Sequence, residues 1–499
     1  MCKAQKGDIM KKRIKSLIAL GMVMLIGSMS LTGCGSTKGS TPSDGGSTEV
    51  KKEEVTKPDK LKWYINVGLT LDDGAEEWRQ EFEKKTGISL EFTPQSNNEY
   101  LQNLDLAFAS KTEPDIFNLA GEDKLSLYAK QGALADITDL VKSSPLWDSI
   151  SKDAWDSVTV DGKIYGVPFE VGTGTITYVR KDWLERVGME EPKTYDEFIK
   201  MLRAFKEQIP ECKIPYTAPG LFENGAVIYL REFYQDATPE FTNVNGKWVD
   251  GMSQDNMSAA LKRMQDAYKE GLIDMEVVTN TTSACRDKWY AGDVGVFNYW
   301  AGTWAVSIEN RVKANVPDAK VVGINAIDET KYMIRVPAVT SISATSKNIS
   351  GAFKYFLEYM HDGGEGQVLF QHGVENLHWK QDGNNLVMLP KLSKPEEKLE
   401  KAFINGESSA TKLNLTDKNV VLDERVTSTL NTLRTTGFQQ LAVPSSKKLT
   451  KINSDLTALK AQTISKVVMG NMTVEDGMKT YLAESKNLGI DEVVEEMNK

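Results

Sequence analysis

Few residues in this sequence have the types and spacing that catalysis needs. The three histidines, His361, His372 and His378, form no HExxH pair, and no GxSxG, Walker or dinucleotide-binding motif occurs. No calcium loop of the Dx[DN]x[DN]G form occurs either. The 70 Asp and Glu residues are too numerous to single out a pair that could cleave a glycosidic bond. The sequence therefore predicts no catalytic group and no cofactor.

Aromatic and planar polar side chains are abundant, and they suit the binding of sugars. A sugar presents apolar C–H faces and a rim of hydroxyls, which flat rings and the side chains of Asp, Glu, Asn, Gln and Arg can recognise. The chain has 10 Trp and 16 Tyr residues, most of which must pack in a core. Rings at strand ends or at crossings between domains are the better candidates for ligand contacts.

Strands and helices alternate from residue 61 to residue 132. Short strands at 61–67, 88–92 and 114–119 are each followed by an amphipathic helix, at 72–85, 97–110 and 122–131. This alternation predicts a parallel sheet with helices on both faces, and ligands bind at the carboxyl ends of such strands. Asn66, Asn97 and Glu122 are therefore candidate contacts. Glu122 could instead be only a carboxylate in the first turn of its helix.

The order of elements in the segment from Asp161 to Gln208 carries more information about the fold than any one of the elements alone. The segment opens on an Asp-Gly hairpin turn, and a proline and two glycines then interrupt it between residues 168 and 174. Residues 176–179 read as a buried strand. Thr194 and Glu197 form a capping box in front of a helix with apolar residues at helical spacing. The pattern predicts a strand, a joint, a second strand and a helix.

The first 33 residues have the features of a secretory signal. Basic residues precede an apolar core from Leu17 to Leu31 that is too short to span a membrane. The Leu-Thr-Gly-Cys sequence that ends at Cys34 resembles a bacterial lipobox, which implies cleavage before Cys34 and attachment of two acyl chains, enough for stable anchoring. A plain secretory signal is the alternative, and translation could start at Met1 or Met10. The polar residues up to 59 read as a flexible tether.

Removal of this signal leaves 466 of the 499 residues, enough for two domains. The signal carries six Lys or Arg residues and one Asp, so its removal changes the formal charge from −10 to −15. So acidic a chain argues against a nucleic-acid partner. Cys212 and Cys285 could pair outside the cell, although sequence cannot place them together. No Cys/His cluster suggests zinc or redox chemistry.

Residues 161–208 resemble the first crossing between the lobes of the extracellular solute-binding proteins of bacterial ABC importers, in their sugar-binding branch. The usual Tyr-Asn of that crossing is replaced by Val179-Arg180, with Tyr178 one place earlier. The resemblance implies an α/β, two-lobed, periplasmic-binding-protein-like fold, in which each lobe is a mostly parallel sheet flanked by helices. The matching residues are Gly162, Lys163, Tyr165, Gly166, Pro168, Lys181, Asp182, Leu184, Gly188, Pro192, Thr194, Asp196, Glu197 and Phe198.

Two further stretches carry the same resemblance. In the family, an element matched here by Gly292, Gly295, Val296, Gly302 and Trp304 brings a strand to the cleft, and its tryptophan stacks on sugar. Residues 373–379 resemble a signature of a narrower lipoprotein branch that serves importers of complex oligosaccharides, with Asn376 in place of the usual glycine. The candidate ligand contacts that follow from the whole resemblance are Trp304, Trp300, Trp379, Glu375, Asn376, Glu170, Tyr178, Tyr229 and Arg231.

The resemblance covers essentially the whole chain after the signal, and it suggests how the lobes divide the sequence. The joint at residues 168–174 is the expected hinge. The expected parts are residues 1–33 (signal peptide), 34–59 (tether), 60–170 (first part of lobe 1), 171–322 (first part of lobe 2), 323–372 (return to lobe 1) and 373–499 (return to lobe 2 and C-terminal helices).

These features together predict a monomeric binding lipoprotein on the extracytoplasmic face of the cell membrane of a Gram-positive bacterium. It would close by hinge motion on a sugar, with an oligosaccharide as the favoured prediction. It would then deliver this sugar to the membrane subunits of an ABC permease. Nothing in the chain would perform chemistry. The alternatives are an extracellular glycan-degrading enzyme, a lipoprotein for a non-sugar solute, and one that feeds a sensor kinase.

Overall fold

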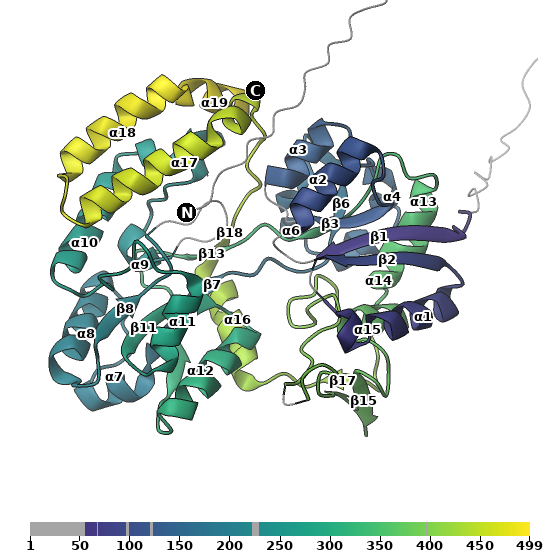
Figure 1. The fold of residues 1–499 in the computed structure, drawn as a ribbon, viewed down its shortest axis with the longest axis horizontal. Helices are drawn as coiled ribbons and strands as arrows, with labels where there is room; N and C mark the ends of the chain where they lie inside the picture. The colour runs from purple at the N-terminus through teal and green to yellow at the C-terminus, as the bar shows by residue number, and fades with distance from the viewer. Residues whose placement is uncertain (1–54, 67, 96–98, 120–122, 222–228, 396) are drawn as a thin grey trace, which may run out of the picture. The chain divides into compact units, whose positions relative to one another are not determined.

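The structure is a computed structural model that describes residues 55–66, 68–95, 99–119, 123–221, 229–395 and 397–499. Residues 54–499 form one compact unit, which contains two main sheets in two lobes (Figure 1). Each sheet carries helices and has its own apolar core. This arrangement confirms the predicted two-lobed α/β fold class.

The first sheet has five strands in the order β2-β1-β3-β14-β6. The first three strands pair in parallel, with Trp63 of β1 opposite Phe92 and Ile116, whereas β14 runs antiparallel to both β3 and β6. The predicted parallel sheet is thus found, and two later segments of the chain extend it. Its strands are β1 (Lys60–Asn66), β2 (Ser89–Gln95), β3 (Ile116–Leu119), β6 (Gly166–Pro168) and β14 (Val339–Ile342).

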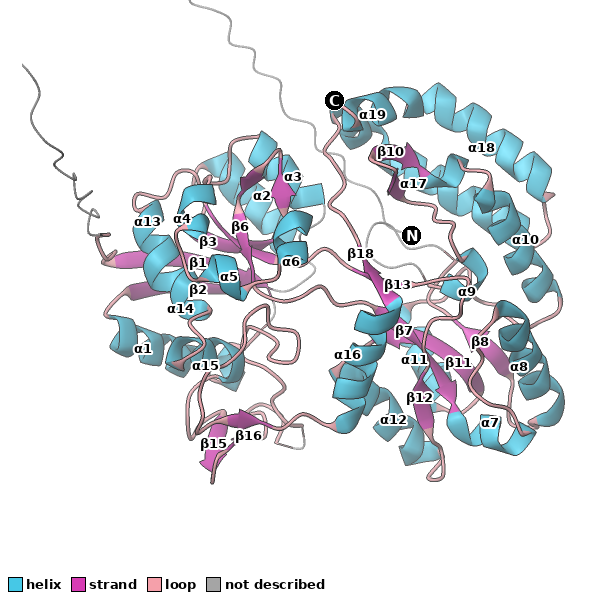
Figure 2. Cartoon of the chain, turned by 180° about the vertical axis from the view of Figure 1, so that it is seen from behind, coloured by secondary structure: helices cyan, strands magenta, loops and turns pink. Residues whose placement is uncertain are grey.

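Helices cover both faces of the first sheet (Figure 2). On one face, Trp78 of α1 packs 5.0 Å from Phe370 of α15 between ring centroids. On the other, Phe108 of α2 packs 5.4 Å from Phe117 of the sheet. The helices of this lobe are α1 (Ala75–Thr86), α2 (Tyr100–Ser110), α3 (Asp123–Lys130), α4 (Thr138–Lys142), α5 (Leu146–Ser149), α6 (Lys152–Ser157), α13 (Ile349–Ala352), a π-helical turn (Phe353–Leu357), α14 (Glu358–Met360) and α15 (Glu365–His372).

The predicted hairpin turn joins β4 (Thr159–Val160) to β5 (Lys163–Ile164). Both turn residues have positive φ, +50° at Asp161 and +76° at Gly162, as a tight two-residue hairpin turn requires.

The second sheet has four strands in the order β12-β7-β11-β8. Only β11 and β8 are parallel, while β7 runs antiparallel to both of its neighbours. Parallel pairing is therefore less extensive here than expected, because β7 comes directly from the first lobe and meets this sheet from the opposite end. The strands are β7 (Thr175–Arg180), β8 (Ile214–Thr217), β11 (Val294–Trp300) and β12 (Val321–Gly323).

The helix after the joint, α8, begins as predicted. Thr194 accepts a hydrogen bond from the backbone N–H of Glu197, and the Glu197 carboxylate accepts one from the backbone N–H of Thr194. The helices that surround the second sheet are α7 (Lys181–Val187), α8 (Tyr195–Gln208), α9 (Arg231–Tyr234), α10 (Asn256–Lys269), α11 (Thr282–Tyr290), α12 (Thr303–Asn315) and α16 (Glu424–Thr436). A hairpin of β9 (Phe241–Val244) and β10 (Lys247–Asp250) lies in the same lobe.

Two segments cross between the lobes in contact with each other, and a segment of the first lobe packs against them. The backbone N–H of Phe169 donates to Ala338 O at 3.2 Å, and that of Arg335 donates to Thr173 O at 2.9 Å. A third segment joins them, because the N–H of Val171 donates to Ser408 O at 2.6 Å. Parallel strands β13 (Tyr332–Ile334) and β18 (Gly437–Gln439) lie beside these crossings.

Residues 373–420 differ from the expected division of the chain. Ala402, Phe403 and Ile404 are buried in the core of the first lobe, where the Phe403 ring lies 4.6 Å from that of Trp78. The segment also forms β15 (Trp379–Asp382), β16 (Asn385–Met388) and β17 (Asn419–Val420). The chain therefore joins the second lobe at α16, later than the boundary expected after residue 372, because residues 402–404 complete the aromatic core around Trp78.

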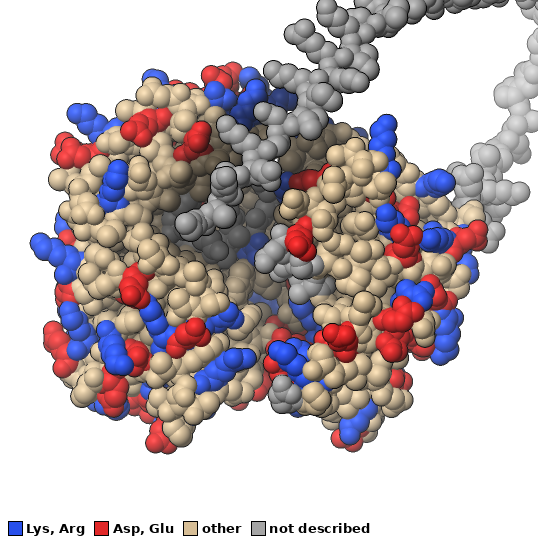
Figure 3. Space-filling model, in the orientation of Figure 1, with Lys and Arg blue, Asp and Glu red and all other residues tan. Residues whose placement is uncertain are grey.

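The C-terminal helices α17 (Lys447–Val468), α18 (Val474–Leu488) and α19 (Ile490–Met497) pack on the second lobe. Within the described residues, no helix has the length and apolar character needed to cross a membrane. Acidic and basic side chains are interspersed over the face shown in Figure 3.

Candidate ligand-binding site

Trp300 and Trp304 lie where the second sheet meets the first crossing. Trp300 is the last residue of β11 and pairs with Thr175, and the next backbone N–H, of Ala301, donates to Gly174 O at 3.0 Å. Trp304 is the second residue of α12, and both tryptophans are only partly buried. The strand end and the start of the helix thus present two rings beside the crossing.

An arginine lies over each of these rings. The guanidinium carbon of Arg335 is 5.4 Å from the centre of the Trp300 ring, and that of Arg286 is 5.3 Å from the centre of the Trp304 ring. These distances allow cation–π attraction. The Tyr299 and Trp304 rings pack nearly perpendicular to each other, with 4.9 Å between centroids. Each tryptophan is therefore held on one side by a cation.

A cavity of about 450 Å³ is lined in part by residues of the β13–β18 pair. Met333 and Phe438 are register partners in that parallel pair, so their side chains share a face, and both line the cavity. Two residues further along the chain, Arg335 contacts Trp300. The size is typical of small-molecule sites. The wall includes Arg231, Thr238, Glu240, Phe241, Trp248, Lys331, Met333, Phe438 and Gln440.

Two carboxylates lie beside the crossings. Ser408 donates to Glu170 Oε2 at 3.4 Å, while Glu407 Oε1 accepts the backbone N–H of Thr303 at 3.0 Å, at the start of α12. Burial raises the pKa of both carboxyls, although Lys401 and Arg335 act in the opposite direction on Glu170. Glu407 thereby ties the segment that returns from the first lobe to the helix that carries Trp304.

The predicted contacts near the crossing have different degrees of exposure. Tyr178 is buried, and its hydroxyl donates to Trp300 O at 2.8 Å. It therefore fixes the backbone of Trp300 and is not itself open to a ligand. Arg231 lines the cavity but is buried, and it donates to Lys331 O at 3.1 Å and to Gln235 O at 2.7 Å. Burial lowers its pKa to about 10. Tyr229 is buried in the core of the second lobe.

The predicted contacts of residues 373–379 lie elsewhere. The Trp379 ring is buried in a small core with Val368 and Leu386, and its Nε1 donates to Gly373 O at 3.0 Å. Glu375 and Asn376 are exposed, and Glu375 lines a separate cavity of about 120 Å³. Asn376 has φ +63°, a left-handed conformation that asparagine tolerates, which explains how it replaces glycine.

The remaining predictions are only partly covered by the structure. Asn66 ends β1 and is partly buried, while Asn97, Glu122 and Cys34 lie outside the described residues. Cys212 and Cys285 are both free, so they form no disulfide here. In the described part of the chain, no group of three or more His, Cys, Asp or Glu side chains could hold a metal ion.

Sequence reasoning missed Arg286, Arg335, Glu407 and Phe438. No motif marks them, because each reaches the tryptophans or the cavity only through contacts between distant segments. Arg335, for example, meets Trp300 because residue 335 pairs with Thr173 of the first crossing.

Some known proteins with similar sequences are named for the carbohydrates that they bind. The fructooligosaccharide ABC transporter substrate-binding protein FusA of Streptococcus pneumoniae is 27% identical over 259 residues, 44% of this chain and 46% of that protein. The polygalacturonan/rhamnogalacturonan-binding protein YtcQ of Bacillus subtilis is 23% identical over 317 residues, 60% of this chain and 63% of that protein. The chain thus spans less than two thirds of the length of either relative.

Solved structures share the fold. A solute-binding protein of Bifidobacterium longum infantis, described as binding HMO and associated with an ABC transporter, superposes with a TM-score of 0.68 at 17% identity, covering 89% of this chain and 98% of that one. The alginate-binding protein AlgQ2 gives 0.61 at 18% identity, covering 89% and 97%. The family model described as bacterial extracellular solute-binding protein matches residues 68–360. The chain belongs to this family of bacterial extracellular solute-binding proteins.

Proposed function

We propose that this protein captures a carbohydrate, an oligosaccharide for preference, outside the cytoplasmic membrane and delivers it to the membrane subunits of an ABC importer. The observation that carries the proposal is the pair of partly exposed tryptophans, Trp300 and Trp304, each with an arginine over its ring, beside the crossings. Flat rings bind the apolar faces of sugars, and guanidinium groups donate to their hydroxyls. The similar proteins named for fructooligosaccharide and polygalacturonan support this class of ligand.

The protein works as a monomer that closes around the crossings. In the closed form, residues of both lobes contact the same ligand. The ligand therefore binds the closed form more tightly than the open form, and this difference in affinity stabilises the closed form. The chain contributes binding and no chemistry, and ATP hydrolysis belongs to other subunits.

Isothermal titration calorimetry with kestose, raffinose, stachyose, maltodextrins and oligogalacturonates tests the ligand class. We expect at least one of them to bind, and Trp300→Ala or Trp304→Ala to weaken that binding about tenfold or more, or 1.4 kcal/mol. Trp147→Ala is the matched control, because Trp147 is 38% exposed but lies in the first lobe, stacked on Trp155. The absence of binding to every carbohydrate would refute the proposed ligand class.

The same proposal places a lipid anchor on Cys34. Cells that express the Cys34→Ala variant should release the protein from the membrane fraction, and labelled palmitate should no longer be incorporated. Retention of both label and membrane association by the variant would exclude Cys34 as the anchor.

A further inference from the structure

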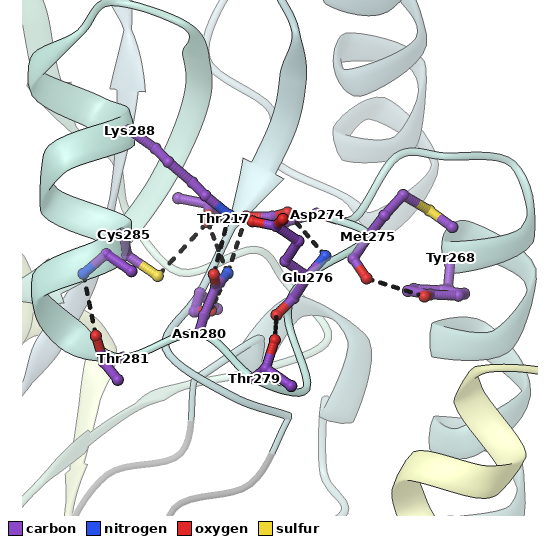
Figure 4. A network of polar contacts seen from close by, with 12 residues as sticks. Thr217, Tyr268, Asp274, Met275, Glu276, Thr279, Asn280, Thr281, Cys285 and Lys288 are labelled. Atoms are coloured by element: carbon purple, nitrogen blue, oxygen red, sulfur yellow. Dashed lines mark hydrogen bonds and ion pairs between the residues drawn. The ribbon is translucent and has the colours of Figure 1, made fainter.

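A buried carboxylate, that of Asp274, collects three donors at the carboxyl end of β8 (Figure 4). Its Oδ2 atom accepts hydrogen bonds from Thr217 Oγ1 at 2.7 Å, Asn280 Nδ2 at 2.8 Å and Lys288 Nζ at 2.8 Å. Burial raises the pKa of this carboxyl, but the three donors together hold it below its ordinary value. The carboxylate is therefore charged and fully engaged.

This carboxylate joins the second sheet to helix α11. Thr217 is the last residue of β8, and Lys288 lies on α11. Lys288 Nζ also donates to Asn280 Oδ1 at 2.9 Å and forms an ion pair with Glu276 at 2.7 Å. Because the side chain of Lys288 is only 21% exposed, these contacts fix the loop before α11 and the helix itself.

Helix α11 in turn lies along α12, the helix that carries Trp304. Its Trp289 is buried and donates from Nε1 to Ile308 O of α12 at 3.2 Å. Arg286, two residues before Lys288, points its guanidinium at the Trp304 ring. Residues two apart in a helix point in different directions, so α11 can meet Asp274 with one side chain and Trp304 with another.

We propose that the Asp274–Lys288 pair is a positioning element for the ligand-contact tryptophan Trp304. It holds α11 so that Arg286 lies over the Trp304 ring, which fixes the surroundings of the ring that a sugar would contact. This inference rests on the proposed function only in taking Trp304 as a ligand contact. The arrangement of the network, α11 and Arg286 is independent of which ligand binds.

A purely structural role is the competing explanation, since loss of the network could simply lower stability. The two explanations differ at Trp304 itself. If the network positions Trp304, removal of one of its hydrogen-bonding side chains must change the surroundings of the Trp304 ring in protein that is still folded.

Fluorine NMR of the 5-fluorotryptophan-labelled protein tests this without any ligand. The Trp304→Phe variant assigns the resonance. We expect Arg286→Met, Asp274→Asn and Lys288→Met each to move the Trp304 resonance by more than its linewidth, and Lys288→Arg to restore it. The matched control is Asp293→Asn, which cuts a 2.9 Å ion pair to Lys213 at the opposite end of β8. An unmoved resonance in folded Arg286→Met and Asp274→Asn protein would overturn the proposal.

Titration with the carbohydrate that wild-type protein binds in the calorimetric panel gives the second readout. Asp274→Asn and Arg286→Met should weaken that binding about three- to tenfold, as expected for loss of a cation–π contact, while Asp293→Asn binds like wild type. If the variants move the resonance but bind with unchanged affinity, the positioning of Trp304 for the ligand is overturned. If wild-type protein binds no carbohydrate, the proposed function fails, and the fluorine spectra still decide whether the network positions Trp304.

Discussion

Glu170 lies where the chain leaves β6 for the crossing, and its charge is unfavourable there. Burial raises its pKa, and the cations Lys401 and Arg335 do not offset that effect. A carboxyl whose pKa is higher in the folded than in the unfolded chain destabilises the folded state above the folded pKa, and this penalty is absent below the unfolded value of about 4.3.

Glu170→Gln should therefore raise the melting temperature at pH 7.5, by about 1–3 °C, and the difference from wild type should shrink to nothing as the pH falls to about 4. Glutamine keeps an acceptor for Ser408. Differential scanning calorimetry across this pH range measures the effect. Glu191→Gln, at an exposed position, is the control with no expected change. A lower melting temperature of Glu170→Gln at pH 7.5 would show that its ion pairs outweigh the cost of burial.

Sequence could propose candidate contacts only from patterns that lie within one segment. Trp304 was predicted from an element in which glycines and the tryptophan lie within 13 residues, and it is partly exposed beside the crossing. Arg286 and Arg335 meet the tryptophan rings through contacts across the fold, so only the structure brings them into view. Trp379 has the same residue type as Trp304 yet is 3% exposed, because exposure depends on neighbours that sequence does not show.

At the scale of elements, the crossing depends on two glycines. A Cβ atom at Gly172 would lie 1.9 Å from Arg335 O, and one at Gly174 would lie 2.2 Å from Met333 O. Both obstacles are backbone atoms of the second crossing, which no change of rotamer can move. The glycines thus allow two crossings to run in contact.

Gly172→Ala should consequently force the crossings apart and lower the free energy of unfolding by about 1–3 kcal/mol. Affinity for any carbohydrate that binds in the calorimetric panel should fall as well, because Trp300 and Arg335 are attached to the two crossings that separate. Urea denaturation and calorimetry measure the two effects. Gly364→Ala provides the comparison, since its Cβ would meet nothing closer than 3.5 Å. Equal stability of the two variants would contradict the close approach.

Elements with strong local signals were predicted well. The hairpin at Asp161-Gly162, the capping box of α8 and the parallel strands β1, β2 and β3 all depend on short-range patterns, and all are found. Strands β13 and β18 were not foreseen, because three-residue strands separated by about a hundred residues have no periodicity to detect.

At the scale of the whole molecule, the chain returns to each lobe after leaving it, and this path limits what sequence can predict. Residues 402–404 fill the first core around Trp78, although the resemblance suggests the second lobe for them. Apolar residues predict burial but not the core in which they are buried. Long-range packing of the C-terminal helices completes the second lobe in the same way.

A buried ion pair attaches those helices. Lys460 of α17 pairs with Asp250 of β10 at 3.0 Å, and both side chains are only 3% exposed. Tyr481 of α18 donates to the other oxygen of Asp250 at 2.8 Å. Removal of one partner leaves the other as an uncompensated buried charge, which is far more costly than loss of a surface pair.

Lys460→Met should lower the free energy of unfolding by about 3–5 kcal/mol, and Lys460→Met combined with Asp250→Asn should recover part of that loss because the isolated charge is gone. Lys262→Met, which removes an exposed pair with Asp266 on the neighbouring α10, should cost less than about 1 kcal/mol. Urea denaturation measures stability, and limited proteolysis shows whether α17 to α19 detach first. If the Lys460 and Lys262 variants lose the same small amount, the pair is not what attaches the C-terminal helices, and their apolar contacts with α10 suffice.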